Sequence, residues 1–372
     1  MKWLQNGNLT KLVAFFVIAV VIICTVSFAA NGWQSFINDD TDDSNITIDK
    51  NESNNQQTEN ESGADIEDIP VIQPVPKYYH QITGLETTLE ASLQKPLCIC
   101  LDSSVPLYGI SSSYLTIEFP TEYGNTRLLC FTDEAKTLGK IGSLAPSRGY
   151  ISNIATYFGG VLLSHGSDDK FEYSFENPKS KLDFSETSGY CYSEYNTFVY
   201  TNGDLVNAFL NNSNISQTNA DKITLPYTFT DATESPTTQG DNAAVISISF
   251  SGSSTTSLNY SISDGKYIFT KDTSIKNDLL NDKAVKYDNV FILYADSTTH
   301  ETESDTQLIL DTNTRGSGVY AYGGKFIEIT WEKDASGSLI FYNTSGEILT
   351  VNRGTSYIAF VKASAKASVK LS

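Results

Sequence analysis

The pattern of apolar and polar positions predicts a first half that mixes strands with helices. Short apolar runs bounded by turn residues predict strands at residues 96–102, 114–119, 127–133 and 159–166. Apolar residues at helical spacing predict helices at residues 150–158 and 203–210, the second with Thr201 or Asn202 as its N-cap. This mixture is typical of an α/β domain, which we place at residues 77–228.

The second half carries strand patterns almost throughout. Apolar runs extend from residue 244 to residue 362, and Asp264–Gly265, Gly323–Gly324 and Ser345–Gly346 lie between paired runs as hairpin turns. Only residues 272–282 show a brief helical pattern. We therefore expect a mainly antiparallel β domain at residues 243–362, after a spacer at 229–242 and before a loose tail at 363–372.

The N-terminal segment at residues 12–30 is apolar and has no charged residue. A helix of this length covers about 28 Å, close to the thickness of a bilayer core. Lys2 and Lys11 precede it, so the positive-inside rule places residues 1–11 in the cytoplasm and the rest outside the plasma membrane. A cleaved signal peptide is the alternative, because Ser27 and Ala29 have the small-residue spacing of a cleavage site.

Residues 31–76 are rich in Asn, Asp, Glu and Ser and poor in large apolar residues. Such a segment buries too little to offset its conformational entropy, so we expect a disordered acidic linker. The whole chain of 372 residues has a formal net charge of -19, which argues against a nucleic-acid partner because phosphates would be repelled.

Motifs for catalysis or metal binding are mostly excluded. His80, His165 and His300 lie far apart and have no metal-binding spacing, so we predict no metal site and no cofactor. The Ser-His-Gly-Ser run at 164–167 resembles the Ser-His-Gly-Cys signature of L,D-transpeptidases, but Ser167 replaces the reactive cysteine. Four cysteines are expected to be buried thiols: Cys98, Cys100, Cys130 and Cys191. A disulfide bridge from Cys98 or Cys100 to Cys130 is the alternative.

A set of polar residues lies near the predicted strand ends of the first half, where ligands of α/β sheets tend to bind. Two carboxylates near a histidine can act as general acid and base, and two arginines can hold a carboxylate or phosphate. Taken singly, each of these residues is more often a loop charge or a salt-bridge partner. The candidate ligand-binding residues are Asp102, Glu118, Glu122, Arg127, Arg148 and His165.

Several motifs in order resemble the YerB-like family, a two-part family of bacterial lipoproteins of uncharacterised function. They are "ITGLE", "KPLCICLD", "IEFPTEYGNTRLL" and "KIGSLAPSRGY" in the first half, and "TRGSGVYAYGGKFIEITWEK", "FYNTSGEI" and "RGTSYIAFV" in the second. The resemblance covers residues 81–362 and implies an N-terminal and a C-terminal family domain. In this resemblance, His165 corresponds to a family histidine at the end of the strand that follows "KIGSLAPSRGY".

Departures from the family concern residues that the resemblance would assign to a site. Ala145 stands where the family has the first of two arginines, and only Arg148 is retained. Thr197 and Phe198 replace a histidine-asparagine pair. Cys24 follows Ile23, where lipid attachment requires a small residue, so a transmembrane anchor is expected in place of the lipid.

Together these features predict a membrane-anchored extracytoplasmic protein of a bacterial envelope. Our leading interpretation is non-catalytic binding of a cell-wall glycan or peptide or of an envelope protein. A cell-wall-modifying hydrolase that uses Glu118 or Glu122 with His165 is the second hypothesis, and a structural spacer is the third.

Overall fold

The computed structural model describes residues 76–165, 181–184, 189–195, 198–219, 223–232, 238–272, 274–275, 277–301 and 306–372. Residues 73–372 form one compact unit. The segment at 12–30, for which we predicted a membrane helix, and the predicted linker up to residue 75 lie outside the described residues. Among the described helices, none has the length and apolar character needed to cross a membrane.

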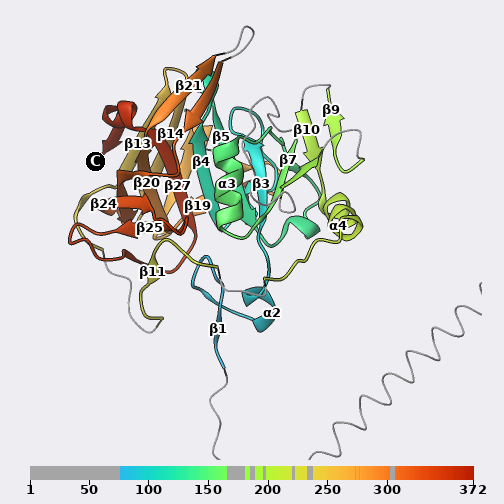
Figure 1. Ribbon diagram of the computed structural model, residues 1–372, viewed down its shortest axis with the longest axis horizontal. Coiled ribbons are helices and arrows are strands. Elements are labelled where there is room, and N and C mark those ends of the chain that lie inside the picture. Colours follow the sequence, from blue (N-terminus) through green and yellow to red (C-terminus); the bar gives the residue numbers. More distant parts are fainter. Residues whose placement is uncertain are drawn as a thin grey trace, which may run out of the picture. The chain divides into compact units, whose positions relative to one another are not determined.

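Within the described residues, one mixed sheet of eleven strands extends through both predicted halves (Figure 1). The first half contributes β3 (Leu97–Asp102), β4 (Leu115–Pro120), β5 (Thr126–Thr132), β7 (Val161–His165) and β8 (Lys181–Phe184). The second half contributes β12 (Asp241–Asn242), β20 (Asn289–Ala295), β23 (Arg315–Tyr322), β24 (Lys325–Lys333), β25 (Leu339–Tyr342) and β27 (Ser356–Lys362). The halves join where β27 pairs in parallel with β4, with Ser356 opposite Leu115.

A second, antiparallel sheet packs on one face of the first. Its strands are β13 (Val245–Ser251), β14 (Ser254–Ser261), β15 (Lys266–Lys271), β16 (Ser274–Ile275), β19 (Lys286–Tyr287) and β28 (Val369–Leu371). Ile246, Leu258 and Phe269 from this sheet share a core with Leu128 and Ile292 from the main sheet. The second half is therefore a two-layer β structure, and its inner layer continues into the first half.

Helices cover the part of the main sheet that comes from the first half. α3 (Gly149–Tyr157) lies across β3, β4 and β5, where Ile151 and Ile154 share a core with Cys98 and Phe119 (Figure 1). α4 (Gly203–Asn212) packs into the other core, and its N-cap is Asn202, whose side chain accepts a hydrogen bond from Leu205 N. Both predicted helices are confirmed, with boundaries shifted by one or two residues.

The remaining elements are short. The strands are β1 (Tyr78–Tyr79), β2 (Glu86–Thr87), β6 (Ile141–Gly142), β9 (Tyr192–Glu194), β10 (Phe198–Thr201), β11 (Thr228–Phe229), β17 (Asn277–Asp278), β18 (Lys283–Ala284), β21 (Ser297–Glu301), β22 (Thr306–Leu310) and β26 (Thr350–Val351). The helical turns are α2 (Leu89–Ser92), η1 (Ile110–Ser112), η2 (Glu122–Gly124), η3 (Ala135–Thr137) and η6 (Ala363–Ser368).

Two expectations for the second half are wrong. The brief helix expected within 272–282 is replaced by the hairpin of β17 and β18, because Asp278 is fully buried and accepts hydrogen bonds from Gly109 N and Ser111 N in the first half. The C-terminal tail is not loose, because β28 pairs with the edge of β13 and the half-buried Leu371 packs against the core. In both cases a contact distant in sequence overrides a weak local preference.

Candidate functional site

The ends of three strands bring several candidate residues to one edge of the main sheet. Asp102 ends β3 and lies opposite Arg127, the second residue of the antiparallel strand β5. Arg127 Nη1 is 3.2 Å from Asp102 Oδ2, and Asp102 Oδ1 accepts hydrogen bonds from the backbone N–H and hydroxyl of Ser104. This pair lies on the face of the sheet that α3 covers, because Arg127 is also opposite the core residue Phe119.

A second ion pair joins Glu122 and Arg148 on the same side. Arg148 is the N-cap residue of α3, and its Nε and Nη2 donate to the two oxygens of Glu122 at 3.1 and 2.8 Å. Glu122 Oε1 also accepts the backbone N–H of Leu308, which is in the second half. Burial raises the pKa of Glu122, but the hydrogen bonds and charge of Arg148, together with backbone hydrogen bonds that include the one from Leu308, outweigh burial and lower it.

The two ion pairs are neighbours around the start of α3. Arg127, Arg148 and Asp102 all act electrostatically on the thiol of Cys100, whose pKa is nevertheless raised by burial to about 12. The structure thus brings four of the six candidate residues together. Each guanidinium in this group already faces a carboxylate, which satisfies its charge within the protein.

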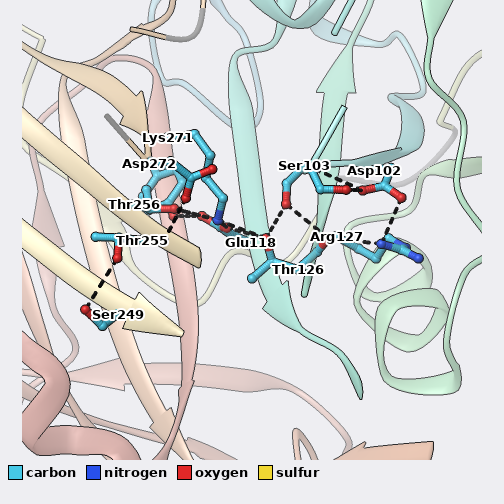
Figure 2. A network of polar contacts seen from close by, with 12 residues as sticks. Asp102, Ser103, Glu118, Thr126, Arg127, Ser249, Thr255, Thr256, Lys271 and Asp272 are labelled. Carbon is cyan, nitrogen blue, oxygen red and sulfur yellow. Dashed lines mark hydrogen bonds and ion pairs between the residues drawn. The ribbon is translucent and has the colours of Figure 1, made fainter. Parts of the chain in front are cut away.

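Glu118 lies on the opposite face, fully buried beneath the second sheet. Its Oε1 is 2.8 Å from Lys271 Nζ, and its carboxylate accepts hydrogen bonds from Thr126 and Thr256 (Figure 2). It also accepts a hydrogen bond from the hydroxyl of Tyr357. Burial alone would raise the pKa of Glu118, but Lys271 and these hydroxyls outweigh burial and lower it. Glu118 is therefore an ionised structural contact between the two sheets.

His165 ends β7 and is separated from Glu118. The segment Ser143–Ala145 lies between β3 and β7 at this edge, because Ala145 N donates to Cys100 O and His165 N donates to Ala145 O. The order from Glu118 is thus β4, β5, β3, this segment and β7. Four spacings between neighbouring strands amount to about 19 Å, too far for Glu118 and His165 to act on one bond.

A wide groove lies elsewhere, where the two halves meet beside the β1–β2 hairpin. It has a volume of about 920 Å³ and is lined by residues from 77–93, 219–229 and Arg353. Tyr78, Tyr79 and Phe229 supply half-buried aromatic surface. The size and mixed lining suit a ligand-binding site, and sequence reasoning missed it because its walls come from segments about 270 residues apart.

Arg353 is held rigidly in this groove. Its guanidinium carbon lies 4.7 Å from the ring centre of Tyr79 and 5.6 Å from that of Phe229. Nε donates to Thr230 O at 3.0 Å, and Nη1 donates to Gly84 O. Gly84 has φ +66°, and a Cβ there would lie within 3.0 Å of the Phe229 ring, so glycine allows this close approach.

Comparisons with known proteins identify both halves. Residues 82–224 match the N-terminal domain, and residues 246–358 the C-terminal domain, of a protein of unknown function (DUF3048). This chain belongs to that two-part family. The crystal structure of YerB protein from Bacillus subtilis is similar, with a TM-score of 0.66 at 18% identity over 80% of this chain and 100% of that chain. No curated protein sequence matches the chain.

The two DUF3048 regions are tied together by the network around Glu118. Glu118 and Thr126 belong to the N-terminal region, and Thr256, Lys271 and Tyr357 belong to the C-terminal region. The sequence itself indicates that Lys271 is buried, because alternation in β15 places it on the same face as the buried Tyr267 and Phe269. A charged residue on the buried face of a strand indicates a buried partner of opposite charge.

In the part of the chain that the structure describes, no three His, Cys, Asp or Glu side chains are grouped so that they could hold a metal ion. Cys98, Cys100, Cys130 and Cys191 are free thiols and buried, as expected, and the bridge to Cys130 is not formed. Cys130 is opposite Ile99, so it lies on the other face of the sheet from Cys98 and Cys100.

Proposed function

We propose that this DUF3048 protein is anchored in the plasma membrane by residues 12–30 and binds a component of the cell wall on the outer side. The uncharged segment after Lys2 and Lys11 supports the anchor and its orientation. The predicted acidic linker at 31–76 would then separate the folded domains that follow it from the bilayer.

Binding is favoured over hydrolysis by the state of the candidate carboxylates. Glu118, Glu122 and Asp102 each lie about 3 Å from a cationic side chain, Lys271, Arg148 and Arg127 respectively. A general acid needs a raised pKa, whereas the pKa values of Glu118 and Glu122 are lowered. The short ion-pair distances and the burial of these side chains suit a role in stabilising the fold.

The groove beside the β1–β2 hairpin is the observation that carries the proposal. It is an open groove with aromatic walls, and it is large enough for several sugar or amino-acid residues. Tyrosine is common at binding surfaces because its ring offers apolar area and its hydroxyl offers a hydrogen bond. We therefore assign ligand binding to this groove.

A sedimentation experiment tests this function with the fragment 73–372, which corresponds to the compact unit. We expect the fragment to pellet with purified cell wall, and Tyr79→Ala to reduce the bound fraction severalfold. Ile262→Ala is the matched control, because Ile262 is 90% exposed and does not line the groove. A fragment that stays in the supernatant would favour the spacer hypothesis, and release of soluble wall fragments would favour the hydrolase.

The anchor requires a separate measurement on the full chain. We expect it to fractionate with membranes and to be digested by protease added outside intact cells. Release into the medium with a new N-terminus at Ala30 or Asn31 would show a cleaved signal peptide in place of the anchor.

A further inference from the structure

We propose that the groove recognises a saccharide that carries a carboxylate, and that Arg353 holds this carboxylate. This inference rests on the proposed wall-binding function and specifies the ligand of the same groove. Two observations support it: the charge of the groove lining and the incomplete hydrogen bonding of the Arg353 guanidinium.

The lining is basic although the chain is strongly acidic. The chain has 44 acidic and 25 basic residues, yet among the described residues that line the groove there is no Asp or Glu. Lys77 and Arg353 lie in the lining, and Glu86 pairs with Lys77 from outside it at 3.0 Å. A groove with this local charge attracts an anionic ligand.

Arg353 keeps a donor available for that ligand. Nε and Nη1 are bound to the backbone carbonyls of Thr230 and Gly84, and the described residues offer no hydrogen-bond acceptor to Nη2. No carboxylate of the described chain forms an ion pair with Arg353, so its positive charge is not neutralised. This differs from Arg127 and Arg148, each of which faces an acid.

The surroundings of Arg353 also fix its geometry before any ligand binds. The rings of Tyr79 and Phe229 lie against the guanidinium, and two carbonyls hold its other nitrogens. A donor held in this way loses little entropy when it binds a carboxylate. The same rings supply apolar area beside the charge, which suits a sugar ring with an acidic substituent better than a small inorganic anion.

His80 is excluded as the anion-binding group by its own contacts. Its Nδ1 accepts hydrogen bonds from the backbone N–H groups of Ile82 and Thr83. Nε2 lies 3.2 Å from Asp133 Oδ2, so it carries the proton and donates to that carboxylate. His80 therefore holds the loop at 80–85 in place, and Arg353 remains the cation available to a ligand.

The test compares two forms of one ligand on the unmodified fragment 73–372. The probe is soluble glycan strands that contain N-acetylmuramic acid, used with free carboxylates and after conversion of the carboxylates to methyl esters. We expect calorimetry to show about ten- to hundredfold weaker binding of the esters, the effect of one charge-assisted hydrogen bond. Because this comparison needs no mutation, it does not depend on whether a variant folds.

A variant then assigns the effect to Arg353. Arg353→Gln should bind the free and esterified strands with equally low affinity, while Arg315→Gln, an exposed arginine outside the groove, should retain the wild-type difference. Equal binding of both strands by the wild-type fragment would overturn the carboxylate inference and leave wall binding intact. Tighter binding of a pentaglutamate peptide than of the strands would assign the groove to an acidic protein partner. Absence of binding to any probe or to intact wall would overturn both proposals.

Discussion

Glu118 and Lys271 form an ion pair of 2.8 Å in the interior, with their side chains 0% and 2% exposed and 153 positions apart in the chain. Each belongs to a different sheet and to a different DUF3048 region. Thr126 and Thr256 supply hydrogen bonds that the buried charges need (Figure 2), and Tyr357 donates another to Glu118. The two family regions are therefore held together by polar contacts as well as by a shared sheet.

Removal of either charge should destabilise the fold strongly. Lys271→Met leaves the Glu118 carboxylate buried without its cation, and we expect a loss of about 3–5 kcal/mol in the free energy of unfolding, measured with urea. The double variant Glu118→Leu with Lys271→Met should recover part of this loss, because both buried charges are absent. Asp264→Asn provides the control, since the Asp264–Lys286 pair is about one-third exposed and its loss should change stability far less. A single variant as stable as wild type would show that the pair contributes nothing.

Stability should also fall on the acid side. The pKa of Glu118 is lowered in the folded state, so its stabilising contribution is complete above its unfolded pKa of about 4.3 and is lost as pH falls through the folded pKa. Glu122 contributes in the same direction. We expect urea unfolding to give a constant free energy between about pH 5.5 and 7 and a decrease below about pH 4.5. Glu118→Gln should make this decrease shallower, and an unchanged slope would contradict the assignment.

Local sequence patterns identified α3, α4 and four of the five strands that the first half contributes to the main sheet, but not β8. The spacing of Ile151 and Ile154 identified α3, and the run from Leu97 to Leu101 identified β3. The cluster of Asp102 with Arg127 could also be anticipated, because strand ends of an α/β sheet meet at one edge. These features depend on neighbours within one element or between adjacent strands.

The role of Glu118 could not be obtained in this way. In β4, Leu115, Ile117 and Phe119 share one face and Thr116 and Glu118 the other, an alternation that usually marks a solvent-exposed second face. That face is instead covered by a sheet formed about 130 residues later in the chain, and Lys271 comes from it. The parallel pairing of β27 with β4 is likewise a contact that no local pattern encodes.

The last strand should contribute measurably to stability, contrary to our expectation of a loose tail. Deletion of residues 369–372 removes the half-buried Val369 and Leu371 and exposes the edge of β13. We expect a loss of roughly 2 kcal/mol in the free energy of unfolding, together with concentration-dependent association through the open edge. Lys370→Ala is the control, because Lys370 is exposed, and should change stability by less than about 0.5 kcal/mol. A truncated fragment with wild-type stability would restore the loose-tail interpretation.

The buried thiols should resist alkylation in the folded protein. Burial raises the pKa of Cys100 and of Cys130 to about 12 and raises that of Cys98 as well, so almost no thiolate is present at neutral pH. Mass spectrometry after brief treatment of fragment 73–372 with iodoacetamide should find these three residues unmodified, and fully modified in urea. Rapid modification of any of them under native conditions would indicate local opening of the main sheet.

Arg148 should act on stability and leave wall binding unchanged. Its two hydrogen bonds to Glu122 connect the start of α3 to η2, and Glu122 in turn accepts Leu308 N from the second half. Arg148→Ala should therefore cost about 2–3 kcal/mol in the free energy of unfolding, and Arg148→Lys should recover only part of it because lysine cannot donate the paired hydrogen bonds. Both variants should still pellet with cell wall at temperatures where they are folded, whereas Tyr79→Ala should not. If Arg148→Lys folds normally and loses wall binding, the ligand binds at the cluster of Asp102, Glu122, Arg127 and Arg148 and not in the groove.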